Sequence, residues 1–96
     1  MQFAWDERKN RANRRKHGIS FETAILVFED PYHLSWQDRE VGGESRWQTI
    51  GEVSGIHVVL VAHTVEETGD DDETIRIISA RKATPQERRI YATQGI

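Results

Sequence analysis

The spacing of apolar residues predicts two helices near the N-terminus, and the second has the clearer core face. Within it, apolar side chains recur at the spacing of one helical face at Phe21, Ala24, Ile25 and Phe28. Ser20 is a good N-cap and Asp30-Pro31 is a stop signal. We therefore expect this helix to begin directly after Ser20 and to run to about residue 29.

The helix before it is polar almost all round. Asp6 can cap a helix over residues 7–17, and Gly18 stands where a left-handed residue commonly ends one. Ala12 is the only apolar residue in its interior. This helix therefore has little apolar face with which to dock.

Segments rich in β-branched residues predict three strands, over residues 46–53, 57–64 and 74–79. Ser54-Gly55 makes a tight turn between the first two, and an acidic segment around Gly69 makes a longer turn before the third. An earlier strand over about residues 33–37, followed by a loop at Gly42-Gly43, is also expected.

The final helix has the strongest start signal. Thr84 is placed as its N-cap, Pro85 as its first residue and Glu87 as the third, which together form a capping box. Two N-terminal helices, an antiparallel sheet of three to four strands and a C-terminal helix predict a single α+β domain over residues 1–96.

Charge is unevenly distributed along the chain. The net charge is −3, yet cations crowd the first predicted helix, at Arg8, Lys9, Arg11, Arg14, Arg15 and Lys16. Six acids crowd the later turn, at Glu66, Glu67, Asp70, Asp71, Asp72 and Glu73. Removing these six negative charges would turn −3 into +3, so a phosphate-binding surface is compatible with the acidic total.

Composition narrows the class of protein further. The chain is 36% hydrophobic and 30% charged, contains no cysteine and has no long apolar run. Disulfides and thiolate metal sites are thereby excluded, and a membrane span or secretory signal is not indicated. The expectation is a soluble cytoplasmic protein.

Motifs spread over nearly the whole chain resemble those of one family. They are Trp5-Asp6, Asn13, Lys16-His17-Gly18-Ile19, Phe21-Glu22, Glu44, Arg46, Ile50-Gly51, the stretch 75–83 and Glu87-Arg88. In their order and spacing they resemble the BrnT-type toxins of bacterial type II toxin–antitoxin pairs.

The resemblance implies a RelE-like toxin fold and a ribonuclease. We expect a metal-independent endoribonuclease that needs no cofactor, because no residues in the sequence make a credible metal site. It also implies a BrnA-type antitoxin as partner, a small DNA-binding protein that neutralises the toxin and represses the shared operon. Cleaving RNA without a metal requires a base for the 2′-hydroxyl proton, an acid for the leaving 5′-oxygen and cations around the phosphate.

Arg81 is the first candidate for such a cation. We expect it just beyond the third strand and just before Thr84, where a short junction would hold it, and the resemblance places an active-site arginine there. The alternative is a surface arginine near the start of a helix, where the helix dipole disfavours its charge.

Arg46 and Glu44 are the second candidates. Alternation puts both side chains on one face of a strand, and the Glu-x-Arg pattern matches the family. Glu44 either orients Arg46 or acts as a base, and orientation is favoured because a free carboxylate beside RNA is repelled by phosphate. The alternative is a local pair on an exposed strand.

Histidine can supply acid–base chemistry near neutral pH, and His17 at the end of the basic helix is a candidate for that role. Its alternative role is that of an ordinary residue at a helix terminus. Lys16, with Arg14 and Arg15, is expected to contact RNA phosphates.

His63 and Arg76 are predicted on neighbouring strands and complete the catalytic candidates, and Lys82 is a further RNA contact. A histidine among apolar strand residues is more often part of the core. His33 and His57 have no constellation around them, and no histidine pair has metal-ligand spacing.

One segment departs from the family pattern. Many BrnT-type proteins carry an arginine soon after the middle strand, whereas here Thr64 is followed by Val65-Glu66-Glu67. Either Arg76 takes the place of that arginine or the protein is weaker on RNA. The acidic segment either masks the site or is a solvated hairpin tip.

Two alternatives to a ribonuclease remain. One is a nucleic-acid or partner-binding module on the same fold without turnover. The other is a DNA-binding regulator that uses the basic first helix, which is disfavoured because that helix has little apolar face to fix its docking angle.

Overall fold

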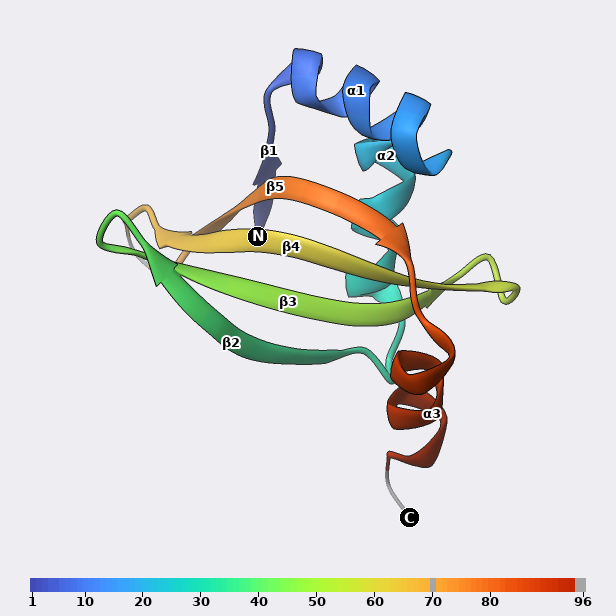
Figure 1. Cartoon of the computed structure of the whole chain (residues 1–96). Helices are drawn as coiled ribbons and strands as arrows, with labels where there is room; N and C mark the ends of the chain where they lie inside the picture. The colour runs from blue at the N-terminus through green and yellow to red at the C-terminus, as the bar shows by residue number, and fades with distance from the viewer. Residues whose placement is uncertain (70, 95–96) are drawn as a thin grey trace.

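A five-stranded mixed sheet with strand order β1-β5-β4-β3-β2 forms the centre of the protein (Figure 1). The computed structural model describes residues 1–69 and 71–94. In chain order the elements are β1 (Gln2–Ala4), α1 (Glu7–His17), α2 (Phe21–Ala24), the 3₁₀ helix η1 (Ile25–Glu29), β2 (Leu34–Val41), β3 (Glu44–Val53), β4 (His57–Glu67), β5 (Glu73–Lys82) and α3 (Pro85–Thr93). None of the described helices is long and apolar enough to cross a bilayer.

Strands β2 to β5 form the antiparallel meander that the sequence predicts, but each is longer than expected. Gly42-Gly43 is a two-residue hairpin turn with both φ angles positive, 59° and 79°, rather than a loop. The α+β class is confirmed, whereas the purely antiparallel sheet is wrong. Strand β1 adds a parallel edge to β5, with Phe3 level with Ile75.

Helix α1 has the predicted bounds and caps. The Asp6 side chain accepts hydrogen bonds from the amides of Arg8 and Lys9, and Gly18 ends the helix at φ 74°. The helix docks through two buried asparagines instead of an apolar stripe. Asn13 donates to the carbonyls of Ile19 and Ala80 and accepts from the Ala80 amide.

Asn10 secures the following helix in a similar way. It donates to Glu22, and its carbonyl oxygen accepts the amide of Phe21. Paired amides of this kind satisfy buried polar groups that would otherwise destabilise the contact. Two polar residues therefore position α1 against α2 and the edge of β5.

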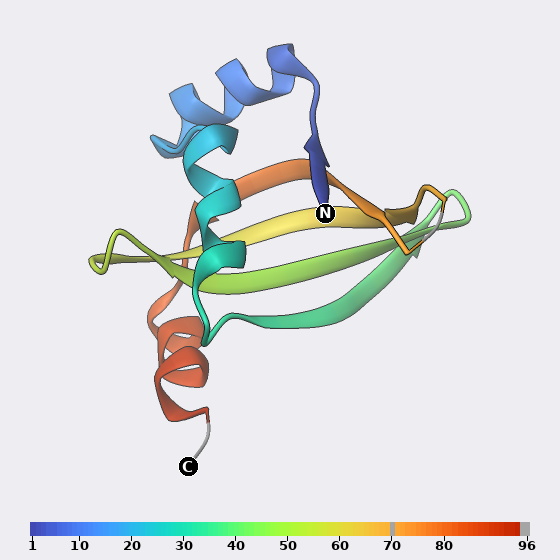
Figure 2. The same cartoon turned by 180° about the vertical axis from the view of Figure 1, so that it is seen from behind.

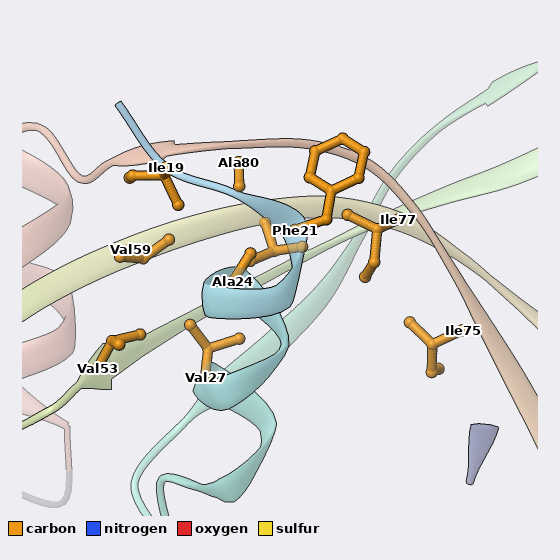
Figure 3. Close-up of a cluster of buried hydrophobic side chains, with 10 residues drawn as sticks. Ile19, Phe21, Ala24, Val27, Val53, Val59, Ile75, Ile77 and Ala80 are labelled. Atoms are coloured by element: carbon orange, nitrogen blue, oxygen red, sulfur yellow. The ribbon is translucent and has the colours of Figure 1, made fainter. Parts of the chain in front are cut away.

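The predicted second helix is one α-helical turn, α2, that tightens into η1. Because a 3₁₀ helix has three residues per turn, Val27 of η1 follows Ala24 on the side that faces the sheet, and Phe21, Ala24 and Val27 are all fully buried. This adds Val27 to the expected core face, of which Ile25 and Phe28 are half-buried against the same cluster. Figure 3 shows these three side chains against Val59, Ile75 and Ile77 of the sheet.

Close packing of η1 on the sheet depends on Gly51 of β3. A Cβ added there would lie 2.9 Å from the carbonyl oxygen of Val27, which is too close for any side chain. Figure 2 shows α2 and η1 crossing this face of the sheet.

Helix α3 packs at one end of the other face. Ile50, Leu60 and Ala83 form a second buried cluster there, with Trp36 and Tyr91 packed against it. The Tyr91 hydroxyl donates a hydrogen bond to Asp30, which also accepts the amide of Glu52. Helix α3 is thus tied to the end of η1, and most of this face is left uncovered (Figure 1).

Candidate nucleic-acid interface

The uncovered face of the sheet carries a row of polar side chains across four strands. Strand register places Arg39 beside Arg46 and Thr64 beside Arg76. Arg46 is level with Thr64 because the next residues, Trp47 and His63, are partners. We call Arg39, Arg46, Thr64 and Arg76 the arginine row, and the side of the sheet that bears it the open face.

Glu44 holds two of these arginines together. Its Oε1 atom lies 2.6 Å from the Nη2 of Arg76 and 3.6 Å from the Nη2 of Arg46. The hydrogen bond from Arg76 holds the pKa of Glu44 below its usual value, and the charge of Arg46 acts in the same direction. Glu44 is therefore a charged clamp that orients the two guanidinium groups.

Glu66 approaches the row from the other side. Its Oε1 atom lies 3.8 Å from the Nε of Arg76, with half of the Glu66 side chain exposed. One member of the acidic segment thus reaches the open face directly. In contrast, Asp72 binds the N-terminal ammonium at 3.1 Å.

Two buried atoms of the row have no hydrogen-bond partner within the described residues: the Nε of Arg46 and the hydroxyl of Thr64. Buried polar groups in native proteins are nearly always paired. The buried polar atoms that still lack a hydrogen-bond partner therefore lie at the centre of this row.

Arg81 also lies on the open face, but apart from the row. It is the partner of Leu60, four residues along β4 from Thr64, which corresponds to about 13 Å. It belongs to β5 and not to a junction beyond the strand, so its predicted placement was wrong.

Arg81 forms a two-pronged pair with Glu87 of the capping box. The Arg81 nitrogens lie 2.8 and 3.0 Å from the two Glu87 carboxylate oxygens. The hydrogen bond from Arg81 is the main cause that lowers the pKa of Glu87 to about 2. In this arrangement Arg81 fixes the start of α3, and its outer edge remains partly exposed.

The two candidate histidines do not join the arginines. His63 is buried on the helix-covered face, where its Nε2 lies 2.7 Å from the Thr49 hydroxyl and its ring meets Phe28 edge-on. Burial lowers its pKa, so the ring is neutral near pH 7. His17 lies half-buried at the end of α1, outside the sheet.

The predicted phosphate contacts outside the sheet are also separate from the row. Arg14, Arg15 and Lys16 are exposed on α1, which lies along the β5 edge (Figure 1). Lys82 is exposed and pairs with Val59, whose side chain belongs to the helix-covered face. These cations flank the open face without sharing it.

Sequence reasoning missed Arg39, because the strand that carries it was expected to end at residue 37. A bulge between Gln37 and Arg39 also breaks the alternation along β2. Simple alternation would have placed Arg39 with Gln37 on the other face, so only the register reveals its place in the row.

Fold and site together define a class: a small α+β protein that presents carboxylate-oriented arginines on the open face of an antiparallel sheet. Such guanidinium groups suit phosphate, because their planar donors match its oxygens. Within residues 1–69 and 71–94, no group of three His, Cys, Asp or Glu side chains is placed to hold a metal ion.

Comparison with known proteins identifies the family. Residues 5–87 match the family model described as "Ribonuclease toxin, BrnT, of type II toxin-antitoxin system". The chain belongs to this family of ribonuclease toxins, and membership in a toxin–antitoxin system implies an antitoxin partner. No curated protein matches the chain.

A solved structure agrees with this assignment. The chain is similar to the ribonuclease toxin BrnT of Brucella abortus, known from a 1.1 Å crystal structure. The two are 26% identical, with a TM-score of 0.61, and the match covers 88% of this chain and 97% of that one.

Proposed function

We propose that this ribonuclease toxin cuts RNA at the arginine row without a metal ion. The observation that carries the proposal is the Glu44 clamp, which holds Arg46 and Arg76 on an open face. Two fixed positive charges stabilise a phosphate as negative charge builds up on it, which is also what a metal ion does.

In the proposed reaction the ribose 2′-hydroxyl gives its proton to water as its oxygen attacks the neighbouring phosphorus. The bond from phosphorus to the 5′-oxygen breaks, a 2′,3′-cyclic phosphate forms, and the 5′-oxygen takes a proton from water. Arg46 and Arg76 bind the non-bridging oxygens. Glu44 chiefly orients the arginines, because its lowered pKa makes it a weak base.

The proposed partner is a BrnA-type antitoxin that binds operator DNA and covers the open face of the toxin. Family membership supports an antitoxin, and the cationic face offers a surface for its acidic residues. The toxin itself contacts DNA only through this partner.

A second candidate function is RNA binding without cleavage. It is favoured by the separation of His17 and His63 from the arginine row, since no imidazole within the described residues lies beside the clamp. The two candidates share the arginines and differ in turnover.

Incubation of the purified protein with single-stranded RNA in the presence of chelator tests the proposal. The expected products end in 2′,3′-cyclic phosphate. Cutting that stops on chelation and returns with magnesium, or products with a free 3′-hydroxyl, would refute the metal-free mechanism. Tight binding without any cutting would select the binding module.

A further inference from the structure

A groove of about 510 Å³ runs between α3 and the open face. Its lining is largely apolar and consists of Trp36, Ile50, Thr84, Gln86, Glu87 and Ile90. Ile90 is 50% exposed and Trp36 is half-buried, so the groove presents a partly accessible indole beside aliphatic surface. This volume lies within the range of small-molecule pockets and is large enough for a nucleobase.

The groove lies next to the arginine row. Trp36 is the cross-strand partner of Gln48, and Gln48 is two residues from Arg46 on the same face of β3. This step corresponds to about 7 Å. A smaller hollow of about 210 Å³ at the Arg39–Arg46 end of the row is lined by Arg39, Arg46, Gln48 and Ser79 among others. Gln48 lines this hollow and its cross-strand partner Trp36 lines the groove, so the two are neighbours.

The chemistry of the two hollows is complementary to the two parts of a nucleotide. The smaller one has guanidinium groups for a phosphate, and the larger one has an indole and aliphatic side chains for a flat base. At the rim, the Gln86 amide makes no hydrogen bond within the described part of the chain and can donate to or accept from a base edge. The Glu87 carboxylate is already neutralised by Arg81.

We propose that this groove is a nucleobase-binding subsite: the RNA backbone crosses the arginine row and one base stacks in the groove against Trp36. The inference rests on the RNA binding proposed above and adds that the protein recognises an unpaired base as well as the backbone. A base inside a duplex would first have to be unpaired and unstacked, at a cost of a few kcal/mol, so the favoured substrate class is single-stranded RNA.

The test compares two probes of equal charge: 2′-O-methyl hexaadenylate, whose blocked hydroxyl prevents 2′-attack, and the same backbone without bases. Loss of the bases should weaken binding to the wild-type chain about 5-fold or more, because base–aromatic stacking is worth roughly 1–3 kcal/mol. Trp36→Leu should reduce this ratio to below about 2-fold, and Trp36→Phe should restore most of it.

Two further variants guard against misfolding and non-specific loss. Ile90→Ala removes an exposed groove side chain that contributes little to the core. It should also reduce the ratio of affinities for the probes with and without bases. Tyr32→Leu removes an aromatic ring that is 67% exposed outside the groove and should leave it unchanged. Thermal melting of all four variants identifies any that do not fold.

Equal affinity of the wild-type chain for both probes would overturn the subsite, as would full base dependence in both Trp36→Leu and Ile90→Ala. Groove variants that weaken only antitoxin binding would assign the groove to a protein partner. Base dependence does not require cleavage, so failure of the ribonuclease mechanism would leave this result intact. RNA cleavage without base dependence would overturn the subsite alone.

Discussion

Arg76 of β5 and Glu44 of β3 meet across β4, with a 2.6 Å hydrogen bond between side chains 32 residues apart in the sequence. This contact spans the strand that carries Thr64 and fixes the spacing of the cations around it. The open face is therefore organised by a carboxylate bridging two non-adjacent strands.

Arg46→Ala and Arg76→Ala should each lower the RNA cleavage rate by about 10²–10³, because each removes a preoriented donor. Each variant should also reduce the salt dependence of RNA binding by about one released ion. Arg8→Ala, on the exposed first turn of α1, is the matched control and should change neither quantity. Equal effects from all three would show that only total charge matters.

Glu66→Gln should strengthen RNA binding by up to about 5-fold at low salt, because this carboxylate approaches the Nε of Arg76 and repels phosphate. Its neighbour Glu67 is exposed and belongs to the opposite alternation of β4. Glu67→Gln should therefore have a smaller effect. Equal gains, measured by titration with a non-cleavable oligonucleotide, would favour a diffuse effect of the acidic segment.

Glu87→Gln should lower stability by on the order of 1–2 kcal/mol at pH 7, since Gln keeps the capping geometry and loses the charged pair with a partly exposed Arg81. The folded pKa of Glu87, about 2, lies below its usual value of 4.5. The stabilisation is therefore complete above about pH 4.5 and is lost as the pH falls towards 2. A melting-temperature difference between the two proteins that did not shrink over this range would contradict the prediction.

Arg81→Ala should also destabilise the protein by about 1 kcal/mol or more, because it leaves Glu87 without its partner. Any loss of toxicity must then be judged against the melting temperature. Arg81→Lys keeps one charged contact and should recover part of the stability. A variant Arg81→Ala with wild-type melting and no toxicity would restore Arg81 as a direct RNA contact.

Tyr91→Phe should destabilise α3 by about 1–2 kcal/mol, since the hydroxyl donates to Asp30, a carboxylate with a lowered pKa. For a chain of this size each kcal/mol lowers the melting temperature by about 4–8 °C. Tyr32→Phe is the control, because Tyr32 is 67% exposed. Equal melting of the two variants would show that the bond to Asp30 contributes little.

Local signals predicted the parts of the fold that depend on neighbouring residues. The Asp6 cap, Gly18 and the Thr84–Glu87 capping box mark helix ends with side-chain and backbone geometry, and all three occur as expected. Strand β1 was missed because three residues carry too little pattern. Its pairing with β5 is a contact between residues more than 70 positions apart.

The site was harder to predict for the same reason. Alternation correctly placed Glu44 and Arg46 on one face, and the structure brings them to Arg76. Alternation also placed His63 on the same face of its strand as Val59 and Val61, and these apolar neighbours correctly indicated a core residue. The bulge at Arg39 and the strand position of Arg81 depend on pairing register, which a single sequence does not encode locally.

Besides holding α1 in place, Asn13 pairs backbone groups at the edge of β5. Its amide occupies the outward N–H and C=O of Ala80, beyond the three residues of β5 that pair with β1. A single side chain thus imitates a peptide group of a missing strand and closes an edge that would otherwise invite another chain to add on. In an Asn13→Ala or Asn13→Leu protein these two groups of Ala80 would lose their partner, and α1 alone would keep other chains from this part of the edge.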